Sequence, residues 1–208
     1  MHSLKQTARP AGLSLKGKTM RRLTILIILV ATAAVALSQE PSKPAVPATQ
    51  DNPFSTHNKF VYGGMKMVLL RSAEKMPEEN YSFRPTEAVR TYGQILGHVA
   101  DVAYSFCSAV RGEKDPNPNN EKTKTSKADL ITALKDVFAY CDPAYAGMTD
   151  TSGAISIRYM GLPSTKIALL NGNLLHMTEH YGNLVTYMRL KNIVPPTSEP
   201  GVLPGSKK

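Results

Sequence analysis

Apolar side chains recur at alternating steps of three and four residues in two long stretches of this 208-residue chain. In the first stretch, from about Thr86 to Val110, they are Val89, Tyr92, Leu96, Val99, Ala103, Phe106 and Val110. In the second, from about Ser164 to the residue before Pro195, they are Ile167, Leu170, Leu174, Met177, Tyr181, Leu184 and Met188. This spacing places the members of each set on one face of an α-helix, and packed helices bury such a face. Each stretch is therefore predicted to be a helix of a bundle.

Two further segments have shorter helical patterns. Residues 54–76 carry Phe60, Met65, Val68 and Leu69, and end before Pro77. A second segment begins at Ser126, which has capping-box spacing with Asp129. It carries Leu130, Leu134, Val137 and Phe138, and is expected to stop before Pro143. Together the four helices predict an all-α four-helix bundle over residues 54–196.

The connections between the helices decide the topology of this bundle. Residues 111–125 are charged and turn-rich, and are predicted to be a loop. Their fifteen residues are long enough to cross back along a bundle, which would make the second and third helices parallel. Cys107 and Cys141 would then lie near the same end and could form a disulfide, whereas an up-down-up-down order would separate them. In residues 144–162, Ile155, Ile157 and Tyr159 alternate too briefly to predict a sheet.

The first 38 residues have the pattern of a secretory signal peptide. Arginines at 21–22 precede an uncharged run over 23–37, and Ala36-Leu37-Ser38 resembles a cleavage site. Met20 is a candidate for the true start. The alternative is an uncleaved membrane anchor, but the run of about fifteen residues is shorter than the roughly 20 that span a bilayer. We therefore expect export to the periplasm or out of the cell, with membrane contact only during export.

The segments on either side of the predicted bundle are not expected to fold. Residues 39–53 contain four prolines and are predicted to be a linker, and residues 197–208 are predicted to be a disordered tail.

Of the net charge of +9, +6 falls in residues 1–38, which leaves only +3 for the rest. A nucleic-acid partner is not expected, because the chain after residue 38 lacks the clustered basic residues that duplex DNA requires. The expected partner is a small molecule, and a homodimer is an open possibility for a bundle of this size.

Three of the five histidines lie beside the predicted apolar faces. His176 and His180 are four residues apart on one side of the fourth helix, and His98 borders the apolar face of the second. Three imidazoles with open positions are typical of a catalytic divalent metal, whereas structural zinc sites normally close with four protein ligands. Imidazoles suit Zn, Ni, Fe or Cu, of which Zn and Ni are the first candidates. The competing interpretation is an amphipathic helix with two histidines on its solvated side.

Two segments resemble the DinB family of metal-binding four-helix bundles: RPTEAVRTYGQILGHVADVAYSFCSAV and LLHMTEHYGNLVTYMRLKNIVPPTSEP. The resemblance extends over residues 54–196 and implies an up-down-down-up order of the helices. It also implies a divalent metal bound by one histidine of the second helix and an HxxxH pair of the fourth, which fall on His98, His176 and His180. Some relatives are transferases or isomerases that use low-molecular-weight thiols. Those thiols are cytosolic, whereas this chain is expected to be exported.

Other side chains are weaker candidates for a role. Asp101, one turn after His98, could orient a ligand as a second-shell acid. Glu179 is more often a solvated helix residue than a base, His57 is expected at the surface, and Cys107 could be a nucleophile only if it is free.

Two functional hypotheses result from these residues. The first is a metal-dependent hydrolase or transferase of unknown substrate, and the second is a non-catalytic module with a stabilising metal. A pocket with an acid or base beside the metal favours the first, and a closed site with a fourth protein ligand favours the second.

Overall fold

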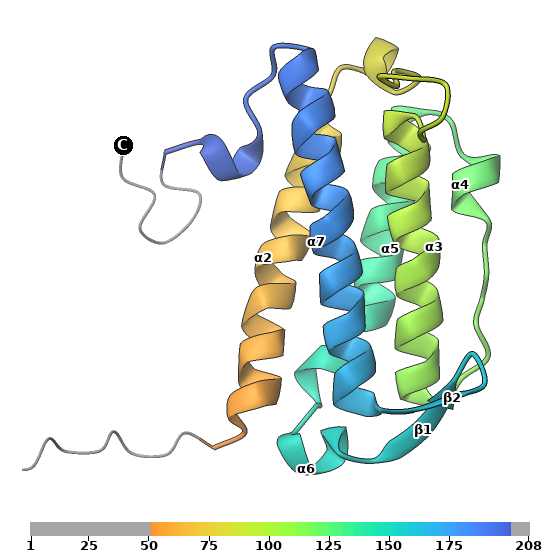
Figure 1. The fold of residues 1–208 in the computed structure, drawn as a ribbon, viewed down its shortest axis with the longest axis vertical. Helices are drawn as coiled ribbons and strands as arrows, with labels where there is room; N and C mark the ends of the chain where they lie inside the picture. The colour runs from red at the N-terminus through yellow and green to blue at the C-terminus, as the bar shows by residue number, and fades with distance from the viewer. Residues whose placement is uncertain (1–50, 201–208) are drawn as a thin grey trace, which may run out of the picture. The chain divides into compact units, whose positions relative to one another are not determined.

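Four long helices form a bundle in the computed structural model, which describes residues 51–200 (Figure 1). They are α2 (Pro53–Lys75), α3 (Tyr92–Arg111), α5 (Lys127–Ala146) and α7 (Lys166–Leu190). Helices α2 and α3 each pack against both α5 and α7, so the four enclose one apolar core. The prediction of an all-α four-helix bundle is confirmed. The predicted signal peptide (1–38), residues 39–50 of the predicted linker and residues 201–208 of the predicted tail lie outside the described residues.

Short elements connect the long helices. They are η1 (Glu78–Asn80), α4 (Asn120–Thr123), α6 (Asp150–Gly153), β1 (Ser156–Tyr159) and β2 (Leu162–Thr165), and a further short helix, η2 (Pro196–Ser198), follows α7. The segment predicted to be a plain loop, 111–125, therefore contains the helical turn α4. Within residues 51–200, no helix combines the length and the apolar character that crossing a membrane requires.

Helices α3 and α5 run in the same direction. Gly93 at the start of α3 lies against Leu130 near the start of α5. Near the other ends of these helices Cys107 and Cys141 form a disulfide, with their Cα atoms 5.4 Å apart. The crossover, residues 112–126, returns along the outer side of α3 and carries α4 (Figure 1). The four helices thus follow an up-down-down-up order.

Helix α3 begins later than its apolar pattern predicts, at Tyr92 rather than Thr86. Thr91 caps it: its side-chain oxygen accepts a hydrogen bond from the Gln94 backbone N–H, and its own N–H donates to the Gln94 side chain. Val89 lies ahead of this cap and is 42% exposed. The first residue of the three-and-four pattern, Val89, therefore lies outside the helix, and the pattern holds from Tyr92 onward.

Helices α2 and α5 also differ from their predicted patterns. Helix α5 does not stop before Pro143 but continues to Ala146, and Tyr145 in this last turn is buried. Pro143 costs the helix one backbone hydrogen bond, and burial of the last turn outweighs that loss. On α2, Phe60 is 71% exposed, because the buried face is the one that carries Tyr62 and Leu69.

The connection before α7 contains a β-hairpin that the sequence pattern was too short to predict. Strands β1 and β2 pair antiparallel, with Tyr159 opposite Leu162. The two residues between them, Met160 and Gly161, both have positive φ (50° and 80°). Positive φ at both central residues is the geometry of a type I′ turn, which matches the right-handed twist of the two flanking strands.

The chain after α7 is ordered beyond the predicted end of the bundle at residue 196. Tyr181 donates a hydrogen bond to the Thr197 side chain and accepts one from the Thr197 backbone N–H. Glu199 forms ion pairs with Arg71 and Lys75 of α2. These contacts hold η2 against the bundle, so residues 197–199 do not belong to the predicted disordered tail.

Candidate metal centre

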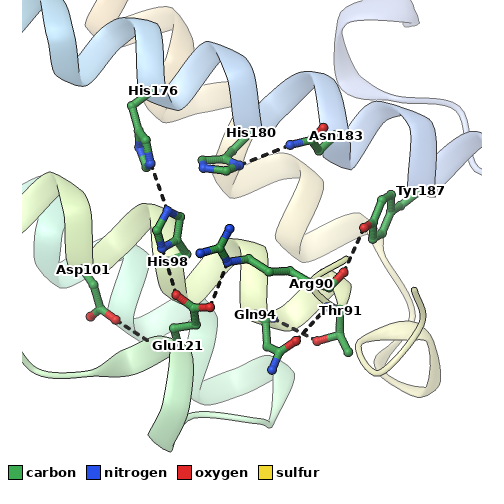
Figure 2. A network of polar contacts seen from close by, with 10 residues as sticks. All are labelled: Arg90, Thr91, Gln94, His98, Asp101, Glu121, His176, His180, Asn183 and Tyr187. Atoms are coloured by element: carbon green, nitrogen blue, oxygen red, sulfur yellow. Dashed lines mark hydrogen bonds and ion pairs between the residues drawn. The ribbon is translucent and has the colours of Figure 1, made fainter. Parts of the chain in front are cut away.

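The three predicted histidines meet where α3 packs against α7 (Figure 2). His98 comes from the middle of α3, and His176 and His180 come from successive turns of α7. The centroids of the three rings are 4.4–5.0 Å apart. One ring nitrogen from each residue lies within 4.8 Å of the other two, so the three histidines could hold a metal ion.

Burial keeps the two histidines of α7 in the neutral form that binds metals. Burial lowers the pKa of His176 to about 3, and the neighbouring rings and Arg90 act in the same direction. Burial also lowers the pKa of His180. At neutral pH both rings are therefore uncharged and present a lone pair, as a metal ligand must.

The donor set fits a divalent transition metal. Imidazole nitrogens bind such an ion at 2.0–2.1 Å, which at tetrahedral angles separates two of them by about 3.4 Å. The Nε2 atoms of His98 and His176 are 3.1 Å apart. Within residues 51–200, no carboxylate or thiolate joins the three imidazoles as a fourth member of the group. A site of this kind leaves coordination positions open.

A carboxylate from the crossover orients His98. Oε2 of Glu121 in α4 is 2.8 Å from Nδ1 of His98. An ionised carboxylate only accepts, so Nδ1 donates to it and Nε2 keeps the lone pair that faces the other histidines. Burial raises the pKa of Glu121, but hydrogen bonds and charge from Arg90 and His98 outweigh it and hold that pKa below its usual range. Glu121 is therefore ionised at neutral pH.

The backbone around Glu121 is fixed against α3. The carboxylate of Asp101 accepts hydrogen bonds from the backbone N–H groups of Asn120 (2.8 Å) and Glu121 (3.0 Å). Gly97 makes the close approach feasible, because a Cβ there would lie 2.7 Å from Cα and N of Glu121. Asp101 and Gly97 thus hold α4 against α3 in a position from which the side chain of Glu121 reaches His98.

Arg90 completes this network and borders a pocket. Its Nε donates to Oε1 of Glu121 at 2.8 Å, and its carbonyl oxygen accepts a hydrogen bond from the Tyr187 hydroxyl, also at 2.8 Å. Beside these residues lies an open pocket of about 690 Å³, whose lining includes Arg90, Gln94, Glu121, Glu179, His180 and Asn183. Asn183 also contacts Nδ1 of His180 at 3.3 Å. Of the three histidines, His180 lines this pocket, so the pocket borders the histidine centre.

Comparison with known proteins places the chain in a family. The sequence profile of the DinB superfamily matches residues 64–184, more than half of the chain. The chain belongs to the DinB superfamily. A curated relative, the uncharacterised protein YjoA of Bacillus subtilis strain 168, is 25% identical over 123 residues, which cover 56% of this chain and 77% of YjoA.

Two solved structures share the fold of this DinB-superfamily protein. A DinB-like protein from Bacillus cereus ATCC 10987 superimposes with a TM-score of 0.60 at 15% identity, over 68% of this chain and 95% of the other. The B. subtilis YjoA structure gives a TM-score of 0.52 at 22% identity, over 65% and 92% of the two chains. At these identities the likeness extends to the fold alone.

The structure distributes the other predicted residues over different roles. Asp101 was predicted to orient a metal-binding histidine. Its carboxylate instead accepts hydrogen bonds from the backbone of α4. Glu179 is exposed and lines the pocket. His57 is exposed on α2, where it borders a different pocket near Ile167 at the start of α7. Cys107 is in the disulfide with Cys141 and is not a free nucleophile.

Sequence reasoning missed Glu121, Arg90 and Gly97 in this DinB-superfamily protein. Glu121 and Arg90 lie in connecting segments without a periodic pattern, so their positions follow only from the folded chain. One signal was present: Gly97 directly precedes His98 in the middle of a strong helical pattern. A glycine there costs helix stability and so indicates close approach of another segment.

Proposed function

We propose that this protein binds a divalent metal ion, Zn or Ni first, through His98, His176 and His180 and uses it as a hydrolase or transferase acting on a small molecule. The observation that supports this proposal is that the three-histidine group has no fourth protein ligand among residues 51–200 and that one of its members, His180, lines an open pocket. An open coordination position next to a cavity is typical of catalytic rather than structural sites.

The side chains of the site have separable tasks in this proposal. Glu121 fixes the tautomer and direction of His98, and Asp101 fixes Glu121. Burial keeps His176 and His180 neutral and ready to bind. When bound, the ion supplies Lewis-acid activation of a substrate or water oxygen. Glu179, exposed in the pocket wall, is a candidate to exchange a proton with the substrate.

The test of metal binding is the metal content of the purified protein and of three variants. We expect about one Zn or Ni per chain in the wild type, and loss of that metal in His98→Ala and in His176→Ala/His180→Ala. His57→Ala is the matched control, because it removes an exposed histidine away from the group and is expected to retain the metal. Helical circular dichroism verifies that each variant is folded. A wild type that takes up no metal when Zn or Ni is supplied refutes the proposal.

We also propose that the protein is exported. Residues 20–38 have the charged, apolar and small-residue pattern of a signal peptide, and a disulfide joins Cys107 to Cys141. Disulfides persist mainly in oxidising compartments, so this bond supports the proposal. Cell fractionation with N-terminal sequencing tests it: we expect a processed protein that begins near Gln39 outside the cytoplasm. A cytoplasmic protein that retains residues 20–38 contradicts it.

A further inference from the structure

Arg90 is held in place at the mouth of the histidine centre by contacts that leave its terminal nitrogens unused. Its backbone is fixed by the hydrogen bond from Tyr187 and by the capping box of Thr91, the next residue. Its side chain is fixed by the single bond from Nε to Glu121. Among residues 51–200, no protein group accepts a hydrogen bond from either Nη atom.

Those terminal nitrogens face the metal centre. Figure 2 shows both on the side of the guanidinium that points toward His98 and His180, at the pocket that Arg90 and His180 line together. The positive charge of Arg90 also contributes to the lowered pKa values of His176 and His180, as expected for a cation close to both rings. The Arg90 side chain is 42% exposed, so a ligand in the pocket can reach it.

The charges around the pocket favour an anion once a divalent ion is bound. Glu121 and Glu179 contribute two negative charges to the lining, whereas Arg90 and a divalent ion contribute three positive ones. A divalent ion near Arg90 is repelled by the guanidinium, and an anion between the two reduces this repulsion. One carboxylate group balances this excess, and it can accept two hydrogen bonds from a guanidinium while an oxygen faces the ion.

We propose that Arg90 is a substrate-binding residue and that the site takes small molecules with a carboxylate or similar oxyanion, held between the metal ion and the Nη atoms of Arg90. This inference rests on the proposed metal site. It predicts that anion binding depends on Arg90 even though Arg90 is not a metal ligand. The nature of the oxyanion then limits the substrate class to acids rather than neutral or cationic molecules.

The experiment uses the Co²⁺-loaded protein, because the visible absorption of bound Co²⁺ reports its coordination. Acetate is titrated into the wild type and into Arg90→Gln, Arg90→Lys and Arg84→Gln. Arg84 is the matched control: it lies in the same connection before α3 and pairs with Glu87, and it does not line the pocket. A parallel titration with inorganic phosphate identifies which oxyanion depends more on Arg90.

We expect a saturable acetate-dependent change in the wild-type spectrum. Its Kd should rise about tenfold or more in Arg90→Gln, as expected for loss of charge-assisted hydrogen bonds, and should rise less in Arg90→Lys and not at all in Arg84→Gln. Every acetate titration is run at saturating Co²⁺, which separates anion binding from any weaker metal binding that follows loss of the bond between Arg90 and Glu121. Co²⁺ affinity without acetate should be unchanged in Arg84→Gln. Equal acetate Kd values in wild type and Arg90→Gln, or no spectral change in the wild type, overturn the inference. Failure of the wild type to bind Co²⁺ refutes instead the metal site on which the inference rests.

Discussion

The substitution Gly97→Ala tests whether the crossover is held against α3 as described. A Cβ at residue 97 would lie 2.7 Å from Cα and N of Glu121 and 2.9 Å from the carbonyl carbon of Asn120. Ordinary contacts between carbon atoms are about 3.5–4.0 Å, so α4 has to move by roughly 1 Å. The atoms in the way belong to the backbone, which cannot rotate aside as a side chain can. The movement should therefore weaken the hydrogen bond between Glu121 and His98.

The size of the effect follows from two opposing contributions. Replacing a helical glycine by alanine stabilises a helix by about 1 kcal/mol, whereas overpacking costs about 1–3 kcal/mol. Gly63→Ala in α2 isolates the first contribution, because a Cβ there meets nothing within 4 Å. The free energy of unfolding of Gly97→Ala should thus fall about 1–3 kcal/mol below that of Gly63→Ala. For a domain of this size, the two melting temperatures should differ by roughly 2–12 °C.

Two assays separate packing from metal binding. Thermal unfolding followed by circular dichroism, with a chelator present, gives the stability difference of the metal-free proteins. Competition with a chromogenic chelator gives the Zn²⁺ affinity, which should fall about 10–100-fold in Gly97→Ala, as is usual when a group that orients a ligand is lost. Gly63→Ala should bind Zn²⁺ as the wild type does. If Gly97→Ala is stabilised as much as Gly63→Ala and retains wild-type affinity, α4 does not lie against α3 in solution.

Three further outcomes are expected. Glu121→Gln retains the shape of the side chain but removes its charge, so Zn²⁺ affinity should fall about tenfold or more. The free energy of unfolding of the metal-free protein should change little. Unchanged Zn²⁺ affinity in chelator competition would show that His98 needs no carboxylate. The free energy of unfolding of the metal-free protein should fall as the pH is lowered from 6.5 toward 3, because the unfolded chain protonates His176 near pH 6.5 whereas burial lowers the pKa of His176 in the folded protein to about 3. Urea unfolding at several pH values measures this slope, and an equal slope in His176→Gln would assign it to other groups. The double variant Cys107→Ala/Cys141→Ala should lose about 3–4 kcal/mol in urea unfolding, since the disulfide joins residues 34 apart in sequence; a loss below about 1 kcal/mol would contradict the bond.

The bundle and the grouping of the three histidines could be predicted from the sequence for the same reason. Burial of one face imposes the three-and-four spacing on α3 and α7, and a regular helix then fixes the direction of every side chain on it, including His176 and His180. Where burial does not act, the pattern was wrong: it placed the exposed Val89 inside α3 and the exposed Phe60 on the buried face of α2.

The parts of the site that could not be predicted lie outside the long helices. Arg90 precedes the cap of α3, and Glu121 lies in the crossover. Their positions depend on contacts between segments distant in sequence, such as the bonds from the backbone of α4 to Asp101. No local spacing encodes such contacts, so the sequence alone does not show that these residues lie together in the folded chain.

The disulfide closes a covalent ring that contains the entire crossover, because Cys107 precedes it and Cys141 follows it. A protease that cuts the chain once between these cysteines leaves one molecule, whose two pieces separate only on reduction. The segment that carries Glu121 can therefore be nicked without dividing the bundle. Such a nick would disturb the orientation of His98 while the helices remain tethered. A gel with and without reductant, run beside a metal-binding measurement, would distinguish the nicked from the intact molecule.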